Sequence, residues 1–294
     1  MSHHHSDSRG IRRLAFLGLL VNLVLSIVKL FAGIVGHSYA LIADAAESLT
    51  DIAGSTIIWA GLRYAARPPD ERHPYGHGRA ESIAALIGGL LVLAAGVGIG
   101  VQAVHAALTP HEPPERWTLA VLVVVVVVKE GMFRVVRRAA VAEGSAAVQT
   151  DAWHHRADAV TSLAAGVGIS LALIGGPAWA AADAWAALVG AVIILYNAVQ
   201  LLHTPFLELM DTTPPEVVEQ ARAVAVGVPG VRVVQKVLAR KSGRILLLDM
   251  HVWVDGSMTV AEAHAIAHRI KDEIRRAMPR VGDVLVHVEP AASA

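Results

Sequence analysis

Six apolar runs, each about as long as a membrane-crossing helix, constrain this chain more than any other feature of its sequence. About 20 apolar residues in a helix span the hydrocarbon core of a bilayer. Apolar residues make up 54% of the 294 residues, which is more than an ordinary soluble domain contains. The sequence therefore predicts a membrane-embedded all-α bundle of six transmembrane helices, with the runs at residues 14–35, 40–64, 81–108, 117–136, 148–174 and 180–203.

Positive charge is distributed unevenly between the loops on the two sides of this bundle. Arginines cluster at residues 9–13, 63–79 and 134–138, whereas the loops on the opposite side contain Arg116 alone. Short loops rich in Lys and Arg stay on the cytoplasmic side of a membrane. We therefore expect an integral membrane protein with both termini in the cytoplasm and an N-terminal tail at 1–13.

The sequence changes character after the transmembrane domain, which we place at residues 14–204. Pro205, Pro214 and Pro215 are expected to break the last membrane helix. The patterns that follow predict a helix at 215–226 with Thr212 or Thr213 near its cap, strands at 231–239, 245–254 and 284–288, and a helix at 260–278. The order αββαβ predicts a cytoplasmic α+β domain at 205–294, a metallochaperone-like open-faced sandwich with its helices on one face of the sheet.

Composition restricts the chemistry available to the chain. It contains no cysteine, 15 histidines and 25 acidic residues, so a metal would be bound by imidazole nitrogens and carboxylate oxygens. The formal net charge is zero, so no nucleic-acid partner is expected, and neither is an organic cofactor. His3, His4 and His5 are either a tag remnant or a loose metal-collecting tail.

Acidic residues occur inside the second apolar run. Asp44, Glu47 and Asp51 are spaced i, i+3 and i+7, which places the three carboxylates on one helix face. A charged side chain in the middle of a bilayer costs about 2.5–3.5 kcal/mol on insertion scales, so such residues usually line a functional pathway. We therefore expect protons or a cation to neutralise these carboxylates.

A second polar cluster, at residues 151–158, lies at the head of the fifth run. His154 and Asp158 are four residues apart and share one face of a helix. Together with Glu47 and Asp51 they would supply three oxygens and one nitrogen, a set that suits a divalent first-row metal.

Other polar residues near these runs leave alternatives open. Asp44 and Asp151 are direct ligands, partners that support the ligands, or part of the route by which the metal arrives. Lys29 and Asn22 either pair with the acidic face or reach an interface or a neighbouring helix. Lys129 follows six valines and marks either the cytoplasmic end of that run or a local ion pair.

The loop after the second run contains a further candidate site. Asp70, His73 and His77 lie close together in a segment shaped by glycine and proline. Their imidazole and carboxylate groups are able to chelate one ion together. The alternative is an ordinary polar loop with two solvated histidines.

Three segments resemble the signature motifs of one family, in the order that the family has them: residues 38–51, 73–81 and 153–158. On these motifs the chain resembles the cation diffusion facilitators, proton-coupled exporters of divalent metal, and in particular their bacterial zinc- or iron-exporting branch. The resemblance implies a homodimer formed through the cytoplasmic domain, with zinc as the first candidate for substrate and regulator. It also implies a transport site at Glu47, Asp51, His154 and Asp158, a loop site at Asp70, His73 and His77, and cytoplasmic ligands at His251, His264, His287 and Glu289.

The chain departs from that branch at three positions. Glu47 stands where Asp or His is usual, which leaves iron, manganese, cobalt and cadmium as alternatives to zinc. Glu289 replaces a usual Asp. Arg232 appears near the position of a usual His ligand, so one cytoplasmic metal is missing or weaker. His268 lies one helical turn after His264 and needs no metal.

The resemblance and the ligand chemistry together predict secondary active transport. A metal and protons compete for the same lone pairs, and this competition is sufficient for antiport. His154 is the expected coupling residue, because imidazole titrates near physiological pH. The chain is not expected to be an enzyme, since it lacks the His-Glu-x-x-His pair of a metalloprotease. The remaining alternative is a membrane-anchored metal sensor or scaffold without transport.

Overall fold

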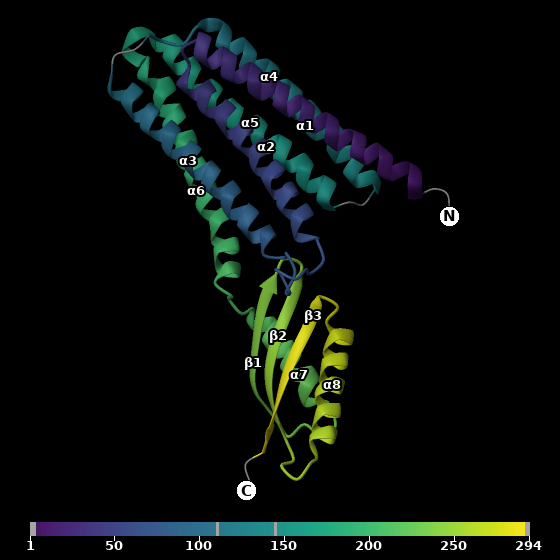
Figure 1. The fold of residues 1–294 in the computed structure, drawn as a ribbon. Coiled ribbons are helices and arrows are strands. Elements are labelled where there is room, and N and C mark those ends of the chain that lie inside the picture. The colour runs from purple at the N-terminus through teal and green to yellow at the C-terminus, as the bar shows by residue number, and fades with distance from the viewer. Residues whose placement is uncertain (1–3, 110–111, 144–145, 292–294) are drawn as a thin grey trace. The chain divides into compact units, whose positions relative to one another are not determined.

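The computed structural model of the protein describes residues 4–109, 112–143 and 146–291 (Figure 1). Within these ranges, the side chains at 4–16, 140, 142–143, 146–151, 154 and 177 lie outside the description. The chain divides into two compact units, Met1–Thr56 with Gly88–Gln200 and Ile57–Ile87 with Leu201–Ala294. His3, among the candidate residues, precedes the described range.

Long helices occupy all six predicted apolar runs. They are α1 (His4–Val35), α2 (Tyr39–Ala65), α3 (Ala80–Leu108), α4 (Arg116–Glu143), α5 (Ala146–Gly175) and α6 (Ala181–Leu209), with a 3-10 turn, η1 (Gly176–Trp179), between the last two. The sequence placed the start of each within a few residues, except for α1, and it ended α4 and α6 too early. Polar side chains close those two helices, and polarity at the end of an apolar run does not stop a helix from continuing.

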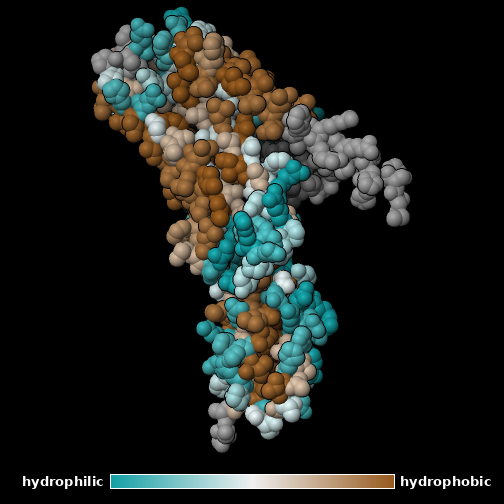
Figure 2. All heavy atoms as spheres, viewed as in Figure 1, coloured by the Kyte–Doolittle hydropathy of each residue, from teal (hydrophilic) through white to brown (hydrophobic). Residues whose placement is uncertain are grey.

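Four helices in the described part of the chain are long and apolar enough to cross a membrane. The segments are Leu17–Val35, Ala80–Leu108, His155–Gly175 and Ala181–Leu209. The two other long helices carry more charge: α2 contains Asp44, Glu47 and Asp51, and α4 contains Lys129 and a run of arginines. Figure 2 shows hydrophobic side chains over the visible face of the helices of the first unit. The chain is therefore a membrane protein.

The start of α2 is held by a residue of α6. Asp183 is fully buried and accepts hydrogen bonds from the Ser38 hydroxyl at 2.8 Å and from the backbone N–H of Tyr39 at 2.5 Å. The first N–H groups of a helix have no partner within the helix, and a carboxylate there also interacts favourably with the helix dipole. Asp183 thus fixes the end of the helix that bears the acidic residues.

The prediction that Pro205 breaks the last long helix was wrong. Pro205 lies inside α6, which continues to Leu209. A proline removes one intrahelical hydrogen bond and costs about 3 kcal/mol or more in a helix interior. The continuation carries Glu208, whose carboxylate accepts a hydrogen bond from Ser82 of α3 at 2.7 Å and one from Lys241. These tertiary contacts favour the last turn despite the proline.

The C-terminal domain has the predicted αββαβ order. Its elements are α7 (Pro215–Val226), β1 (Val233–Ser242), β2 (Ile245–Val254), α8 (Val260–Ala277) and β3 (Val281–Pro290). The strands form one sheet in the order β1-β2-β3, with β1 antiparallel and β3 parallel to β2. Thr213 lies next to the cap of α7, as predicted, but Pro214 occupies the N-cap itself and the Thr213 hydroxyl donates to the Ala239 carbonyl.

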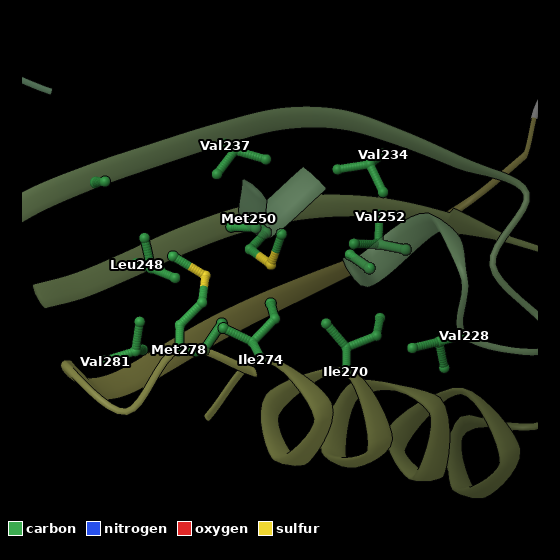
Figure 3. Close-up of a cluster of buried hydrophobic side chains, with 14 of the residues drawn as sticks. Val228, Val234, Val237, Leu248, Met250, Val252, Ile270, Ile274, Met278 and Val281 are labelled. Carbon is green, nitrogen blue, oxygen red and sulfur yellow. The ribbon is translucent and has the colours of Figure 1, made fainter. Parts of the chain in front are cut away.

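Both helices of this domain pack against one face of the sheet. Alternate residues of β2, from Leu246 to Val254, are buried, as the period of a strand with one covered face requires. They share one core with Ile266, Ile270 and Ile274 of α8, and Ile270 and Ile274 point toward the strands in the close-up of this core (Figure 3). Ala221 and Ala225 of α7 complete this core. The opposite face of the sheet therefore remains open.

Candidate metal sites

The acidic face of α2 lies partly inside the helical unit. Asp44 is buried, whereas Glu47 and Asp51 are half-buried. Asp44 and Glu47 line a cavity of about 130 Å³ together with residues of α5 and α6, among them Thr161 and Gly190. An otherwise apolar cavity bordered by two carboxylates is suited to a small cation.

Asp44 already has a cationic partner. The Lys29 ammonium lies 3.0 Å from Asp44 Oδ1 and also donates to the Ser48 hydroxyl at 2.7 Å and to the Asp44 carbonyl at 3.0 Å. Ser162 of α5 donates to Asp44 Oδ2 at 2.8 Å. A buried ion pair is stable only when such additional hydrogen bonds satisfy both charges. Of the two alternatives for Lys29, the structure selects pairing with the acidic face.

Asp158 on α5 also has a lysine partner. Lys129 of α4 lies 2.5 Å from Asp158 Oδ2 and donates at 2.5 Å to the side-chain oxygen of Asn22 on α1. Asn22, Lys129 and Asp158 are all buried. Lys129 thus forms an ion pair, as one alternative had it, but the pair is not local, because its partners come from two other helices.

The structure describes the side chains of only part of the predicted four-residue transport site. The side chains of His154 and Asp151 lie outside the described residues, although both residues belong to α5. Among the described side chains, Glu47, Asp51 and Asp158 do not form a group whose ligand atoms all lie within 4.8 Å. The transport site therefore stays a prediction.

The loop residues Asp70, His73 and His77 do converge. Their ligand atoms lie within 4.8 Å of one another. The Asp70 carboxylate contacts both imidazoles: Oδ1 lies 3.0 Å from His73 Nδ1 and Oδ2 lies 3.2 Å from His77 Nε2. Desolvation raises the pKa of Asp70, but hydrogen bonds from the His73 backbone and ring and from the Arg72 N–H outweigh it and lower that pKa overall. An ionised carboxylate beside two imidazoles is a suitable set of metal ligands.

His77 is more buried than His73, and its ring orientation is more strongly constrained. His77 is buried and its Nδ1 lies 3.2 Å from the Pro68 carbonyl, whereas His73 is exposed. A neutral imidazole that donates from Nδ1 to a carbonyl has a lone pair on Nε2. That lone pair faces the Asp70 carboxylate, so a proton or a metal ion between the two atoms would remove their repulsion. The geometry favours a chelating loop over two solvated histidines.

The open face of the C-terminal sheet carries the second converging cluster. His251 of β2 and His287 and Glu289 of β3 place their ligand atoms within 4.8 Å of one another. His251 and His287 are directly paired across the two strands. A hydrogen bond from His251 at 2.7 Å and another from the Trp253 indole at 2.9 Å lower the pKa of Glu289. Glu289 therefore presents a charged carboxylate to two imidazoles.

His264 does not belong to this cluster. It lies on α8, where its ring contacts that of His268 with 4.5 Å between the ring centroids. His264 and Glu289 line one pocket beside Asp255, yet the metal-ligand group in the described chain contains only the three strand residues. Arg232 forms an ion pair with Asp255 at 3.3 Å. His264 therefore lies outside the three-residue group, and its role as a metal ligand stays a prediction.

Sequence reasoning missed the partners of the acidic residues. Ser48 and Ser162 were not singled out, and neither was the role of Asp183 at the start of α2. A serine in an apolar helix gives no local signal of its partner. Lys129 gave a signal, since a lysine after a run of valines must find a counter-charge if it stays in the membrane.

Two family models cover nearly the whole chain. The model described as the cation efflux transmembrane domain matches residues 15–210. The model described as the cytoplasmic domain of cation efflux proteins matches residues 213–291. The boundary between these two matches falls where α6 ends and α7 begins.

Similar proteins are found in several bacteria. The manganese efflux system protein MneP of Bacillus subtilis is 33% identical over 95% of this chain and 96% of its own length. The cation-efflux pump FieF of Cronobacter sakazakii is 31% identical over 98% of this chain and 96% of its own length. The magnetosome protein MamM of Paramagnetospirillum magneticum is 33% identical over 95% of this chain and 88% of its own length.

Both family models and these relatives agree with the motifs that the sequence contains at 38–51, 73–81 and 153–158. Members of this family are membrane transporters of metal cations, not enzymes. The chain belongs to the cation diffusion facilitator family of cation efflux proteins.

Proposed function

We propose that the protein exports a divalent first-row metal from the cytoplasm by exchange with protons. The observation that carries this proposal is the acidic face of α2 beside a cavity in a membrane-embedded bundle. A scaffold or sensor has no use for carboxylates there, because each one costs free energy in a membrane. The family membership supports transport in general, and the ligand chemistry supports the coupling to protons.

In this proposal Glu47, Asp51, His154 and Asp158 form the transport site. The site binds metal when it is deprotonated and faces the cytoplasm. After the helices have turned the site outward, protons displace the metal, because both bind the same lone pairs. His154 provides the coupling, since the charge of an imidazole changes near physiological pH.

The arrangement of the chain in the membrane follows from the same proposal. All six long helices cross the bilayer, α2 and α4 with their charged faces turned inward. The termini and the C-terminal domain lie in the cytoplasm, with the domains divided at residues 13 and 204. The ligands His251, His287 and Glu289 bind a regulatory metal in a homodimer, a role that the name of the cytoplasmic family model supports.

Zinc and manganese are the two main candidates for the transported metal. Three oxygens and one nitrogen suit zinc in tetrahedral geometry. Manganese also accepts an oxygen-rich site, and MneP is named as a manganese efflux protein. Metal competition during transport by the wild type and Glu47→Asp distinguishes them. A shorter carboxylate should shift the preference toward zinc if Glu47 enlarges the site.

The test is metal flux in proteoliposomes containing the full-length protein. Asp51→Asn and Asp158→Asn should each reduce flux by at least about tenfold, because each removes a charged ligand. Glu130→Gln is the matched control: Glu130 pairs with Arg134 on its own helix, so flux should persist. Metal binding without movement in the wild type would support the sensor instead. For coupling, His154→Ala should alter the dependence of flux on pH, and an unchanged dependence would exclude His154 from that role.

A further inference from the structure

Two lysines are buried inside the helical unit, with exposed fractions of 0% for Lys29 and 1% for Lys129. Their partners differ in kind. Lys29 has three acceptors, on Asp44 and Ser48, and Asp44 is outside the proposed set of four ligands. Lys129 has two acceptors, and one of them is Asp158, a proposed ligand. The Asp158 carboxylate is thus both the ion-pair partner of the Lys129 ammonium group and a proposed ligand of the transported metal.

The charges in this region support a shared role for the carboxylate. Asp44, Glu47, Asp51 and Asp158 provide four carboxylates, and the two buried lysines provide two ammonium groups. With all six groups ionised, two negative charges remain, which is the charge that one divalent cation neutralises. The lysines therefore set the charge of the metal-free region, because an isolated buried carboxylate would be strongly unfavourable.

From this geometry, and on the basis of the proposed function, we infer that Lys129 is a tethered counter-cation that competes with the metal for Asp158. In the metal-free protein its ammonium group neutralises Asp158, as observed at 2.5 Å. When a metal binds Asp158, the ammonium group weakens that contact, and when the metal leaves, the contact re-forms. The exchange is one of cations at Asp158 and requires no proton transfer by the lysine.

Asn22 provides a hydrogen-bond acceptor for the Lys129 ammonium group when a metal displaces it from Asp158. Its side-chain oxygen accepts from Lys129 at 2.5 Å at the same time as Asp158 does. An amide oxygen is a neutral acceptor and holds an ammonium group less strongly than a carboxylate does. Lys129 can thus remain hydrogen-bonded to α1 while the carboxylate of α5 binds metal. Without such a partner, displacement would leave a buried and unsatisfied charge.

This role makes Lys129 a determinant of affinity and of release. A competing cation weakens metal binding and speeds metal departure. Lys129→Met should therefore bind metal more tightly, by about tenfold in Kd, equivalent to about 1.4 kcal/mol. In proteoliposomes the same variant should show a lower KM together with a lower kcat, because the metal leaves more slowly. A purely structural role would not lower the KM.

The binding experiment uses the full-length protein in detergent, titrated with zinc or manganese chloride. Asp70→Asn and His251→Ala are present throughout, so that the loop and cytoplasmic clusters contribute little. Lys29→Met is the matched control, since it removes an equally buried lysine that does not contact Asp158. It should change the Kd much less than Lys129→Met does. Lys129→Arg keeps the charge and should restore an affinity close to that of the wild type.

A second variant tests the idea if Lys129→Met does not fold. Asn22→Asp keeps the lysine and offers it a carboxylate of its own, of nearly the same shape as the amide. It should also tighten metal binding, because Asp158 is released from its counter-ion. Unchanged or weaker binding by both Lys129→Met and Asn22→Asp would overturn the inference. So would equal effects of Lys129→Met and Lys29→Met, which would indicate a general effect of charge.

Failure of the proposed function would give a different result. In the same titration, Asp158→Asn should weaken metal binding strongly. If it does not, Asp158 is no metal ligand and the proposed transport site is wrong. If Asp158→Asn weakens binding and Lys129→Met has no effect, the transport site stands and only the counter-cation role of Lys129 is lost.

Discussion

At the scale of single residues, ion pairs decide what each candidate ligand is able to do. Asp70 is exposed, yet hydrogen bonds from the His73 backbone and ring hold it in place against buried His77. The three residues converge because the segment is short and because His77 is packed edge-to-face against Tyr64. In an extended loop the same residues would be independent. Local packing therefore turns an ordinary polar sequence into a chelating group.

The loop site is tested by removing its charged member. Asp70→Asn should weaken metal binding at this site by about tenfold or more, since it removes the charge of the carboxylate whose two oxygens each contact one of the imidazoles. The titration uses full-length protein with Asp158→Asn and His251→Ala, which disable the other proposed sites. Glu71→Gln is the control, an exposed neighbour outside the cluster. Equal loss in both variants would mean that only the charge of the loop matters.

At the scale of the elements, close approach between helices depends on individual glycines. The glycines of α3 differ from one another in how closely a neighbouring helix approaches them. A Cβ atom on Gly96 would lie 3.0 Å from Ile194 and Leu195, whereas one on Gly98 would have nothing within 4 Å. α5 and α6 approach each other closely at Gly168, where a Cβ atom would lie 2.3 Å from that of Ala186. Sequence spacing alone does not separate these cases, because both kinds of glycine fall in apolar helices.

Two glycines of α5 make a matched test of this contact. Gly168→Ala should destabilise the protein by about 1–3 kcal/mol, because the added methyl group overlaps Ala186. Gly166→Ala adds the same atom two residues away, 3.8 Å from Leu122, and should be neutral or slightly stabilising. The measurement is thermal unfolding of the full-length protein in detergent. Similar melting temperatures for the two variants would contradict the close contact.

At the scale of the whole molecule, the open sheet face of the C-terminal domain is its most distinctive surface. It carries His251, His287 and Glu289 together with exposed Leu238 and Leu285, and Figure 2 shows hydrophobic side chains gathered over the strands. Metal ligands and exposed leucines on one face fit a surface that meets a second copy of the chain. The matched cytoplasmic family model is named for dimerisation. We therefore expect this face to contribute to the homodimer.

A charge at the centre of that face tests the assembly. Leu285→Glu should lower the dimer fraction of the full-length protein, measured by sedimentation in detergent, because it would bury a carboxylate in the interface. Val260→Glu is the control: Val260 is 87% exposed at the start of α8 and is not part of the sheet. Chelation of metal should weaken the wild-type dimer if the cluster binds a regulatory ion. A dimer unaffected by Leu285→Glu would place the interface elsewhere.

The sequence by itself determined the six long helices and the αββαβ order, because both depend on local properties. The length of an apolar run decides whether a helix can span a bilayer, and the period of apolar residues distinguishes helices from strands. It also placed Asp70, His73 and His77 in one short loop, where few arrangements keep them apart. Where a helix ends was less certain: the extension of α6 through Pro205 depends on contacts of Glu208 with Ser82 and Lys241.

Only the tertiary structure decided which distant residues meet. Asn22, Lys129 and Asp158 come from three helices, and 107 residues separate the first two. Their pairing results from the packing of the helices, because a buried ammonium group must reach a carboxylate or an amide wherever the fold brings one. His264, which the resemblance grouped with the cytoplasmic ligands, lies on α8 with its ring against that of His268, and its role as a ligand stays a prediction. The sequence supplied the ligating groups, and the packing of the helices and strands decided which of them come into contact.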